Sequence, residues 1–498
     1  MGEKQKRETG NALFSVVRGA ALFLGGTSIS KILKFVLNLV LTNTLGATLF
    51  GIYSYGRSVN RILITLAQLG TGKSLLKFIP EKKADQARTN WVVALAYFTG
   101  LAASVLFGTL IYIYSPIITK ATLEAPLLTD VLRIFALVLP FQTVLLLINE
   151  TFRALEKLEY RIAIRDILKP IIHIITISVA FFLGYSLLGA VVALAVSTVL
   201  LFSIAITILN TNTDIEIFGD KSSGSKTEFY NFSLPLVAKD VGRILYTRID
   251  ILMVGLFLSS ATVGIYRVSI LLATVLSLPL GAVNQLFPPI ASDLYSNNQI
   301  NEFKSVYETT TRWVITLIIP PMIVLILYVE EVLLLFGEGF TEGAIVLQLF
   351  VVAQFTNSAV GPSGYALTMT EHQYLNMINQ ISLGVTNAIL NYFFILEFGF
   401  IGAAVATSGT LTVINIARVL EVNYYEGISP YSKKLIKPAI SGVLTFISLF
   451  FIKSFFTGYL LLAIGTVSGV IIFLATLLLQ GIEERDREFF NKYVMDVI

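Results

Sequence analysis

Long apolar segments set the strongest limit on what this chain can fold into. A helix needs about 20 apolar residues to cross the hydrocarbon layer of a bilayer. Segments of this kind occur fourteen times, at 12–41, 49–78, 91–114, 127–152, 162–183, 187–209, 229–258, 263–291, 306–328, 345–369, 374–396, 400–422, 435–452 and 459–479. They are too long for strands and lack the alternation of a membrane barrel. The sequence therefore predicts an all-α polytopic membrane protein with about 14 transmembrane helices.

The composition agrees with a membrane location and excludes several kinds of chemistry. Of the 498 residues, 55% are hydrophobic and 14% are charged, whereas soluble domains carry about 25% charged residues. The chain has no cysteine, which excludes disulfides, thiolate catalysis and cysteine-ligated metals. The two histidines, His173 and His372, are too few and too far apart for a zinc motif. We expect neither a metal site nor a cofactor.

Three sequence blocks recur in the same order at a nearly constant offset. The pairs are GIY at 51 and 264, SKIL at 30 and GRIL at 242, and GAV at 189 and GAA at 402. One such match could arise by chance in an apolar sequence, but three with a shared offset indicate two tandem copies of one unit. Each copy holds six of the apolar segments, so both copies share one orientation in the membrane. The copies should be related by a pseudo-two-fold axis along the membrane normal.

The repeat and the polar stretch between its copies predict the domain organisation. We expect an N-terminal six-helix bundle at 1–210, a cytoplasmic linker at 211–228 and a C-terminal six-helix bundle at 229–424. Residues 425–498 lie outside the repeat and should form two extra transmembrane helices and a cytoplasmic tail.

Basic residues gather in alternate connections between the apolar segments. They include Lys82, Lys83, Arg153, Lys157, Lys433 and Lys434. The opposite connections are poor in bases, and the longest of them, 330–343, has four glutamates and no base. Because positively charged loops remain on the cytoplasmic side, we predict a multi-pass protein of the cell (plasma) membrane with both termini in the cytoplasm.

Several bases lie inside the apolar segments, where each costs about 2.5 to 3.5 kcal/mol at the bilayer centre. The predicted substrate-binding residues are Lys31, Lys34, Arg57, Arg61, Arg243 and Arg267. Lys31 and Lys34 share one helical face, as do Arg57 and Arg61. Lys31, Arg61 and Arg243 fall near the middle of the membrane, where a long side chain reaches the headgroups least easily. These positions predict a cationic cavity for an anionic substrate.

Other interpretations of the same charges stay open. The pairs Arg248–Asp250 and Lys239–Asp240 could be local structural charges, and Arg57 and Arg267 could extend to the outer membrane interface. Asp250 is also the one serious candidate for coupling transport to an ion. His173 is more often a hydrogen-bonded packing residue than a proton relay.

The arrangement as a whole resembles a known family. The chain resembles the polysaccharide-export (oligosaccharide) flippases. The features that carry this resemblance are the six, six and two spans, the Leu45-Gly46 turn before GIY at 51, the echo of GIY at 264 and the central bases. These flippases belong to the multidrug/oligosaccharidyl-lipid/polysaccharide exporter superfamily and are related to the lipid II flippase. The resemblance implies two bundles in a V shape that alternate between inward-open and outward-open states. It also implies a groove for the lipid tail at 435–479.

In the lipid II flippase branch, arginines of early spans surround the substrate pyrophosphate. The matching candidates are Lys31, Arg57, Arg61, Arg243 and Arg267, with lysine in place of arginine at 31. The resemblance and the charges predict a flippase that moves a polyprenyl-(pyro)phosphate-linked oligosaccharide from the cytoplasmic to the outer leaflet, for cell-surface polysaccharide or glycan synthesis. The expected partners are this anionic lipid-linked substrate and membrane lipid. We expect no enzymatic activity, no nucleic-acid partner and a monomer.

Two other functions were compared with this one. A cation-coupled multidrug exporter of the same superfamily would need an unpaired buried carboxylate, and Asp250 is the candidate. A membrane glycosyltransferase or ligase would normally expose a sizeable domain or a long loop with acidic and histidine residues. The longest connection here is the short linker that follows Asn210.

Overall fold

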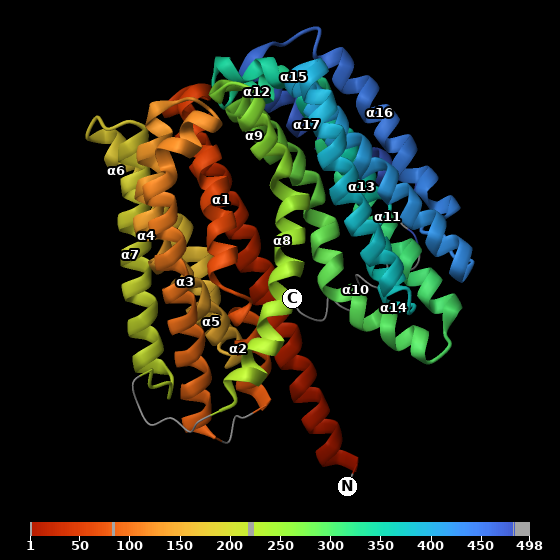
Figure 1. The fold of residues 1–498 in the computed structure, drawn as a ribbon. Helices are drawn as coiled ribbons and strands as arrows, with labels where there is room; N and C mark the ends of the chain where they lie inside the picture. The colour runs from red at the N-terminus through yellow and green to blue at the C-terminus, as the bar shows by residue number, and fades with distance from the viewer. Residues whose placement is uncertain (1, 82–84, 218–223, 482, 484–498) are drawn as a thin grey trace. The chain divides into compact units, whose positions relative to one another are not determined.

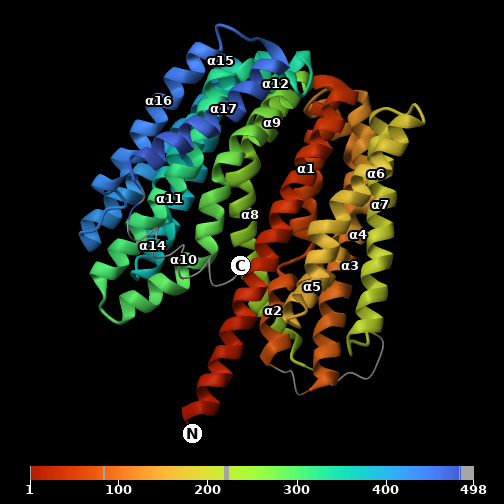
Figure 2. The ribbon, with the colours of Figure 1, turned by 180° about the vertical axis from the view of Figure 1, so that it is seen from behind.

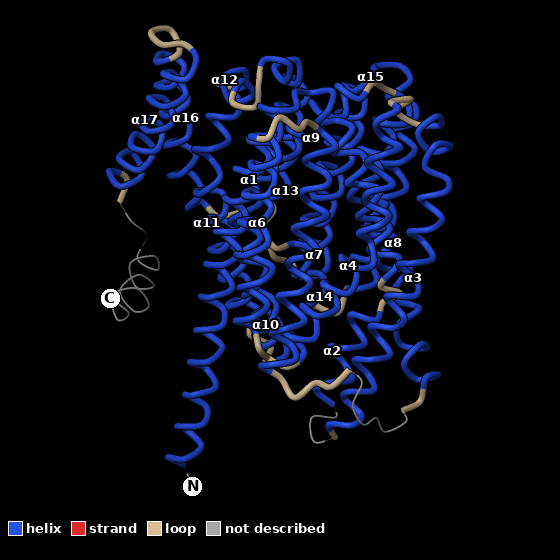
Figure 3. Tube along the Cα trace, turned by 90° about the vertical axis from the view of Figure 1, so that its left-hand side faces the viewer, coloured by secondary structure: helices blue, strands red, loops and turns tan. Residues whose placement is uncertain are grey.

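The structure is a computed structural model that describes residues 2–81, 85–217, 224–481 and 483. For 2–28, 238, 239, 241 and 243–247 it describes the backbone alone. Every regular element in these ranges is a helix (Figure 3). The predicted all-α architecture is therefore confirmed. The chain divides into two compact units, Met1–Gly264 and Ile265–Ile498.

The first unit is a bundle of long helices (Figure 1). Its elements are α1 (Gly2–Ala67), α2 (Thr71–Glu81), α3 (Gln86–Ala121), α4 (Pro126–Ala154), α5 (Leu158–Ile162), the π-helix η1 (Ala163–Leu168), α6 (Lys169–Phe182), α7 (Leu187–Asn212) and α8 (Lys226–Phe257). Side chains start two of these helices. Asp85 accepts a hydrogen bond from the Arg88 amide at 2.9 Å, and Ser225 accepts one from the Glu228 amide at 3.2 Å. Such N-caps satisfy amides that lack a partner within the helix.

The second unit contains the remaining helices, seen from behind in Figure 2. They are most of α9 (Ser260–Ala273), η2 (Thr274–Ser277), α10 (Leu278–Ser296), α11 (Ile300–Leu327), α12 (Val329–Leu334), η3 (Glu338–Gly343), α13 (Ala344–Ala359), α14 (Ser363–Met369), α15 (Gln373–Glu426), η4 (Lys433–Leu435), α16 (Ile436–Ile452) and α17 (Gly458–Leu479). The last two helices, α16 and α17, pack against each other and against α11. The buried Tyr328 hydroxyl donates to the Leu449 carbonyl at 2.9 Å and fixes this contact.

Two of the long helices contain a reversal at a glycine. In α1, Gly46 has φ 67° and ψ 178°, and in α15, Gly399 has φ 59° and ψ −139°. Residues with a side chain rarely adopt a positive φ, so glycine suits both positions. Each reversal divides its helix into two arms. The Thr407 hydroxyl of the second arm of α15 joins the two arms, because it donates to the Asn387 side chain at 3.1 Å and accepts from the Asn391 side chain at 3.2 Å.

The number of spans follows from these reversals. Ten helical stretches of the described chain are long and apolar enough to cross a membrane. Two of them, 29–67 and 373–426, contain the reversals at Gly46 and Gly399, and each holds two of the predicted segments. The predicted segments 162–183 and 229–258 are helical as well, but neither is among the ten. All fourteen predicted segments are thus mainly helical, although residues 68–70 interrupt the segment 49–78 and residues 360–362 interrupt the segment 345–369.

The first helix of the second sequence copy, α8, belongs to the first unit. It packs against α1 and α2, and Lys73 of α2 forms an ion pair with Asp240 of α8 at 2.8 Å. At the other end of α8, Gly255 leaves room for the buried Tyr55 of α1, because a Cβ at Gly255 would lie 2.3 Å from the Tyr55 ring. These contacts place α8 beside the bases of α1. The predicted linker at 211–228 separates the two sequence copies, whereas the two compact units meet at 264 and 265. The linker stays a prediction.

Candidate functional site

The two arms of α1 bring three of the predicted residues together. Lys34 lies in the first arm, and Arg57 and Arg61 lie in the second arm, beyond the reversal at Gly46. The three side chains are exposed on the surface of the protein. The charges of Arg57 and Arg61 act on Lys34, so the three groups lie within electrostatic reach of one another. The predicted grouping of these bases is therefore present in the structure.

A fourth and a fifth base come from the fifth apolar segment. Arg165 lies in the π-helix η1, and Lys169 begins α6; both elements pack against α1. Four positive groups act on Lys169, namely Arg57, Arg61, Lys34 and Arg165. Short π-helical turns inside α-helices occur frequently at functional sites. Here the π-helical turn η1 contains Arg165, directly precedes Lys169 and packs against α1.

His173 follows Lys169 by one helical turn and completes this stripe. Its side chain is only 5% exposed, and its Nε2 has no hydrogen-bond partner in the described part of the chain. Lys169, Arg57 and Lys34 act on the ring electrostatically. The burial of His173 fits the predicted packing residue, whereas its Nε2 lacks the hydrogen bond that the prediction included. Its proximity to the bases was not predicted.

Arg57 is held in place by the repeated GIY block. Its guanidinium donates a hydrogen bond to the hydroxyl of Tyr53, and its central carbon lies 5.7 Å from the centre of the Tyr53 ring. Tyr53 is only 2% exposed, so it provides a fixed anchor one helical turn before Arg57. A cation over an aromatic face is attracted by the ring. Arg57 is thus oriented before any ligand arrives.

Two carboxylates accompany the bases. Asp166 is buried beside Arg165, with 4.0 Å between Nε and Oδ1. Asp250 of α8 is buried, accepts a hydrogen bond from the Ile251 amide at 2.7 Å and acts on Arg248. The positive charge of Arg57 also acts electrostatically on Arg248, so α8 contributes a base to the cluster. The cluster therefore comprises Lys34, Arg57, Arg61, Arg165, Lys169 and Arg248, with Asp166 and Asp250.

The other predicted residues have different positions. Lys31 is exposed on the first arm of α1, three residues before Lys34. Arg243 belongs to α8, but its side chain lies outside the described residues. Arg267 is half-buried and lies in the second unit. The structure therefore brings together Lys34, Arg57 and Arg61, and the substrate-binding role of all six residues stays a prediction.

Sequence reasoning missed Arg165, Lys169 and Arg248 as parts of the cluster. Arg165 and Lys169 lie in the first third of the predicted segment 162–183, where bases near a connection are ordinary. A signal was nevertheless present, since Arg165, Lys169 and His173 are spaced four residues apart and share one helical face. Asp240 was paired in the sequence with its neighbour Lys239, whereas its partner Lys73 is 167 residues away.

The cluster is suited to an anion. Its six bases outnumber its two carboxylates, so pairing within the cluster cannot neutralise it. Like charges held together among membrane helices are costly unless water or a counter-ion reaches them. Phosphate oxygens accept charge-assisted hydrogen bonds from guanidinium and ammonium groups. The spanning helices and this cluster together define a multi-span membrane protein with a group of bases suited to an anionic ligand.

The sequence comparison identifies the family. Residues 16–292, which are more than half of the chain, match the family of polysaccharide biosynthesis proteins. The chain belongs to this family. The matched region contains every residue of the cationic cluster.

Individual relatives agree with this assignment. The chain is 26% identical over 259 residues to the probable low-salt glycan biosynthesis flippase Agl15 of Haloferax volcanii, a match that covers 51% of this chain and 55% of the relative. The chain thus spans about half the length of this curated relative.

Solved structures show a similar fold. The lipid II flippase MurJ in an inward closed conformation has a TM-score of 0.73 and 16% identity, over 92% of this chain and 98% of that chain. An inward-facing MATE family multidrug resistance transporter of the MOP superfamily has a TM-score of 0.62 and 14% identity, over 79% of this chain and 98% of that chain. At these identities the likeness concerns the fold alone.

Proposed function

We propose that this protein is a flippase that moves a polyprenyl-linked oligosaccharide, joined through a phosphate or pyrophosphate, from the cytoplasmic to the outer leaflet. The observation that carries the proposal is the convergence of six bases from four apolar segments on one cluster with two carboxylates. The family assignment and the relative named as a glycan biosynthesis flippase support the same substrate class. Transport serves cell-surface polysaccharide or glycan synthesis.

The residues of the cluster have distinct roles in this proposal. Arg57, oriented by Tyr53, and Arg61 hold the phosphate oxygens, while Lys34 and Lys169 supply further positive charge. Lys31, Arg243 and Arg267 contact the substrate at other stages of an alternating-access cycle. The prenyl chain stays in a hydrocarbon environment. The protein breaks no covalent bond, acts as a monomer, and has both termini in the cytoplasm.

The proposal is tested by a translocation assay in proteoliposomes with a defined polyprenyl-diphosphate oligosaccharide. Arg61→Glu should abolish translocation while leaving folded protein in the membrane, because a carboxylate repels the phosphate. Arg153→Glu is the matched control, since Arg153 is an exposed base of the same unit that forms an ion pair with Glu150 at 3.5 Å. Unchanged translocation by Arg61→Glu would remove the cluster from the mechanism.

The alternative function is a cation-coupled multidrug exporter of the same superfamily. Asp250 is the buried carboxylate that such a mechanism needs, although Arg248 lies within its electrostatic reach. Proton-dependent efflux of a cationic dye that is lost in Asp250→Asn would favour this function. Dye efflux that is absent in the wild-type protein would exclude it.

A further inference from the structure

One carboxylate of the cationic cluster lacks a hydrogen-bonded partner. Asp166 lies in η1, is 6% exposed, and its Oδ1 lies 4.0 Å from Nε of Arg165. It accepts no hydrogen bond from the residues that the structure describes. A buried carboxylate is unfavourable unless it is paired and hydrogen-bonded. The stabilisation of Asp166 therefore comes from the positive charges near it.

Three bases supply this positive charge. Among the charged groups that act on Lys34, Asp166 acts most strongly. Asp166 also acts on Arg161 of α5, and Arg165 precedes it in the chain. Because η1 packs against α1, the pairing of Asp166 with Lys34 joins two elements that are far apart in the sequence.

Two other aspartates of this unit are held differently. Asp240 accepts two hydrogen bonds from Nζ of Lys73, at 2.8 and 2.9 Å. Asp250 accepts one from the Ile251 amide at 2.7 Å. Short hydrogen bonds to an ion fix its geometry. The bases around Asp166 make no such bond to it, so they can turn toward another anion without breaking one.

Lys34 is the base of this group that is best able to change its partner. Its side chain is exposed, whereas Asp166 is buried. A lysine carries a compact charge on a flexible stem. Lys34 can therefore pair with Asp166 in the empty protein and with a phosphate in the loaded protein. Arg57, by contrast, is already anchored on Tyr53.

We propose that Asp166 is the resident counter-ion of the cationic cluster, which pairs with Lys34 in the empty protein and repels the phosphate of a bound substrate. The proposal rests on the proposed function for the identity of this ligand. Repulsion between like charges is strong where water is scarce. It limits the affinity for the substrate, and differences in affinity appear mostly in the rate of dissociation. Asp166 should therefore speed the release of the phosphate.

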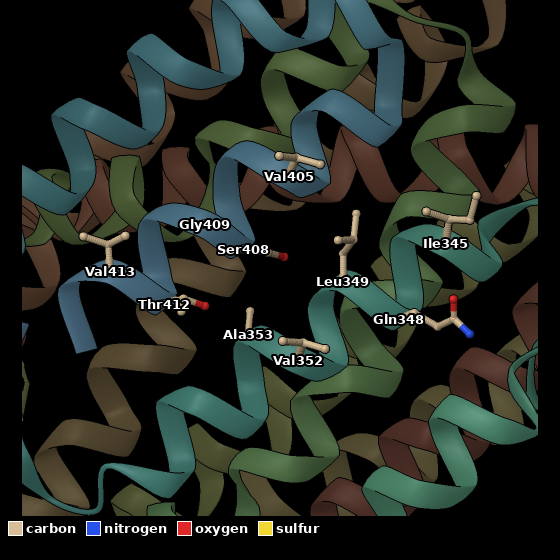
Figure 4. Close-up of a pocket in the computed structure, with 10 residues that line it drawn as sticks. All are labelled: Ile345, Gln348, Leu349, Val352, Ala353, Val405, Ser408, Gly409, Thr412 and Val413. Carbon is tan, nitrogen blue, oxygen red and sulfur yellow. The ribbon is translucent and has the colours of Figure 1, made fainter. Parts of the chain in front are cut away.

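The groove in the second unit offers no comparable charges. It lies between α13 and the second arm of α15, has a volume of about 450 Å³ and is lined by 10 residues, none of which is charged (Figure 4). A phosphate in this groove would meet neither a base that binds it nor a carboxylate that repels it. The effect of Asp166 on the phosphate should therefore arise in the cluster.

Titration calorimetry of the detergent-solubilised full chain with geranylgeranyl diphosphate tests the proposal. Asp166→Asn should lower the dissociation constant by about tenfold, because it removes one negative charge that repels the phosphate. Asp166→Glu keeps this charge and should bind the diphosphate as wild type does, within about twofold. Geranylgeraniol, which has no phosphate, should bind equally to all three proteins.

Asp240→Asn is the matched control, because it removes a hydrogen-bonded aspartate of the same unit. This variant should have a lower Tm and a dissociation constant within about twofold of wild type. An unchanged or weaker affinity in Asp166→Asn, or an equal gain of affinity in Asp240→Asn, would overturn the proposal.

Translocation separates a role in release from a structural role. At saturating polyprenyl-diphosphate oligosaccharide in proteoliposomes, Asp166→Asn should slow translocation by about threefold or more, and Asp166→Glu should restore it. Slower translocation without tighter binding would mean that Asp166 only supports the fold. If Asp166→Asn is recovered unfolded, it is purified with geranylgeranyl diphosphate, which supplies the missing negative charge. Folded protein obtained only with this ligand would support the proposal, and unfolded protein in both preparations would overturn it.

The two measurements also separate this proposal from the proposed function. Tighter diphosphate binding by Asp166→Asn, in a protein whose wild type moves no lipid-linked sugar, would retain the counter-ion and reject the flippase. Translocation that is abolished by Arg61→Glu and unaffected by Asp166→Asn would retain the flippase and reject the counter-ion.

Discussion

Lys169 is the residue whose role the structure changes most. It lies at the start of α6, and four positive groups act on it. A base in such surroundings gains a favourable partner only when an anion enters the cluster. In the proposed function, Lys169 therefore contributes to anion binding, and this role stays a prediction.

Replacing Lys169 by alanine should weaken binding of geranylgeranyl diphosphate to the detergent-solubilised protein by about tenfold, since a hydrogen bond to a charged group contributes about 1.5–3 kcal/mol. Titration calorimetry gives the dissociation constant. Lys169→Arg should restore most of the affinity, and the salt dependence of binding should be shallower in Lys169→Ala. Lys157→Ala is the control, because Lys157 is a half-buried base of the same unit that donates to the Asn212 carbonyl. Equal affinities of Lys169→Ala and wild type would contradict the assignment.

At the scale of elements, the approach of α1 to the start of α9 depends on two glycines. A Cβ at Gly51 would lie 1.7 Å from the carbonyl oxygen of Ser260, and a Cβ at Gly264 would lie 2.2 Å from the carbonyl oxygen of Ala47. Backbone atoms cannot move aside as a flexible side chain can. The two helices therefore have to separate if either glycine gains a side chain.

Gly51→Ala should destabilise the protein by about 1–3 kcal/mol or more, the usual cost of overpacking. Gly281→Ala is the matched substitution, because that site is open and alanine is favoured over glycine in a helix by about 0.5–1 kcal/mol. Thermal unfolding in detergent should thus give a lower Tm for Gly51→Ala and an unchanged or higher Tm for Gly281→Ala. Similar Tm values for both variants would show that the helices do not rely on this contact.

Two bases at the start of the stretch 433–452 and one carboxylate beyond the end of α17 join the ends of α16 and α17. Glu483 accepts from Lys437 at 2.6 Å and lies 3.3 Å from Lys434. The hydrogen bond from Lys437 lowers the pKa of Glu483, burial opposes this shift, and Lys434 lowers the pKa further. Because the pKa is depressed in the folded state, the stabilisation is present above the ordinary value of about 4.3 and is lost as the pH falls through the folded value.

Glu483→Gln should therefore speed amide hydrogen exchange at the start of α16 at pH 7, after correction for the intrinsic exchange rate. Wild type and variant should become alike only when the pH has fallen through the depressed pKa of the folded state, which lies below the ordinary carboxyl value of about 4.3. A difference that persists at lower pH would mean that the charge of Glu483 does not hold these ends together.

At the scale of the whole molecule, the sequence was sufficient for the fold and insufficient for part of the site. Spans could be predicted because the hydrocarbon layer requires long apolar segments. The bases of α1 could be found because charges stand out within such segments. Lys169 and Arg165 escaped detection because bases near a segment end are ordinary. The pairing of Lys73 with Asp240 depends on how α2 and α8 pack, which local sequence does not specify.

The predicted topology is open to a direct test, because the chain has no native cysteine. Glu342→Cys and Lys433→Cys place single thiols in connections predicted to lie on opposite sides of the membrane. A membrane-impermeant maleimide should label Glu342→Cys in intact cells and Lys433→Cys only after permeabilisation. The reverse pattern would invert the orientation and the proposed direction of transport.

The contact between Gly51 and Gly264 has a consequence for how this protein can change over evolution. A Cβ on Gly264 would lie 3.2 Å from the amide nitrogen of Gly51, the same residue of the other sequence copy. A position that meets its own counterpart is characteristic of isologous interfaces between identical subunits. The fused chain retains such an interface internally, so a larger residue at either glycine cannot be accommodated by the other copy. The sequences of the two copies therefore cannot diverge independently at these two glycines.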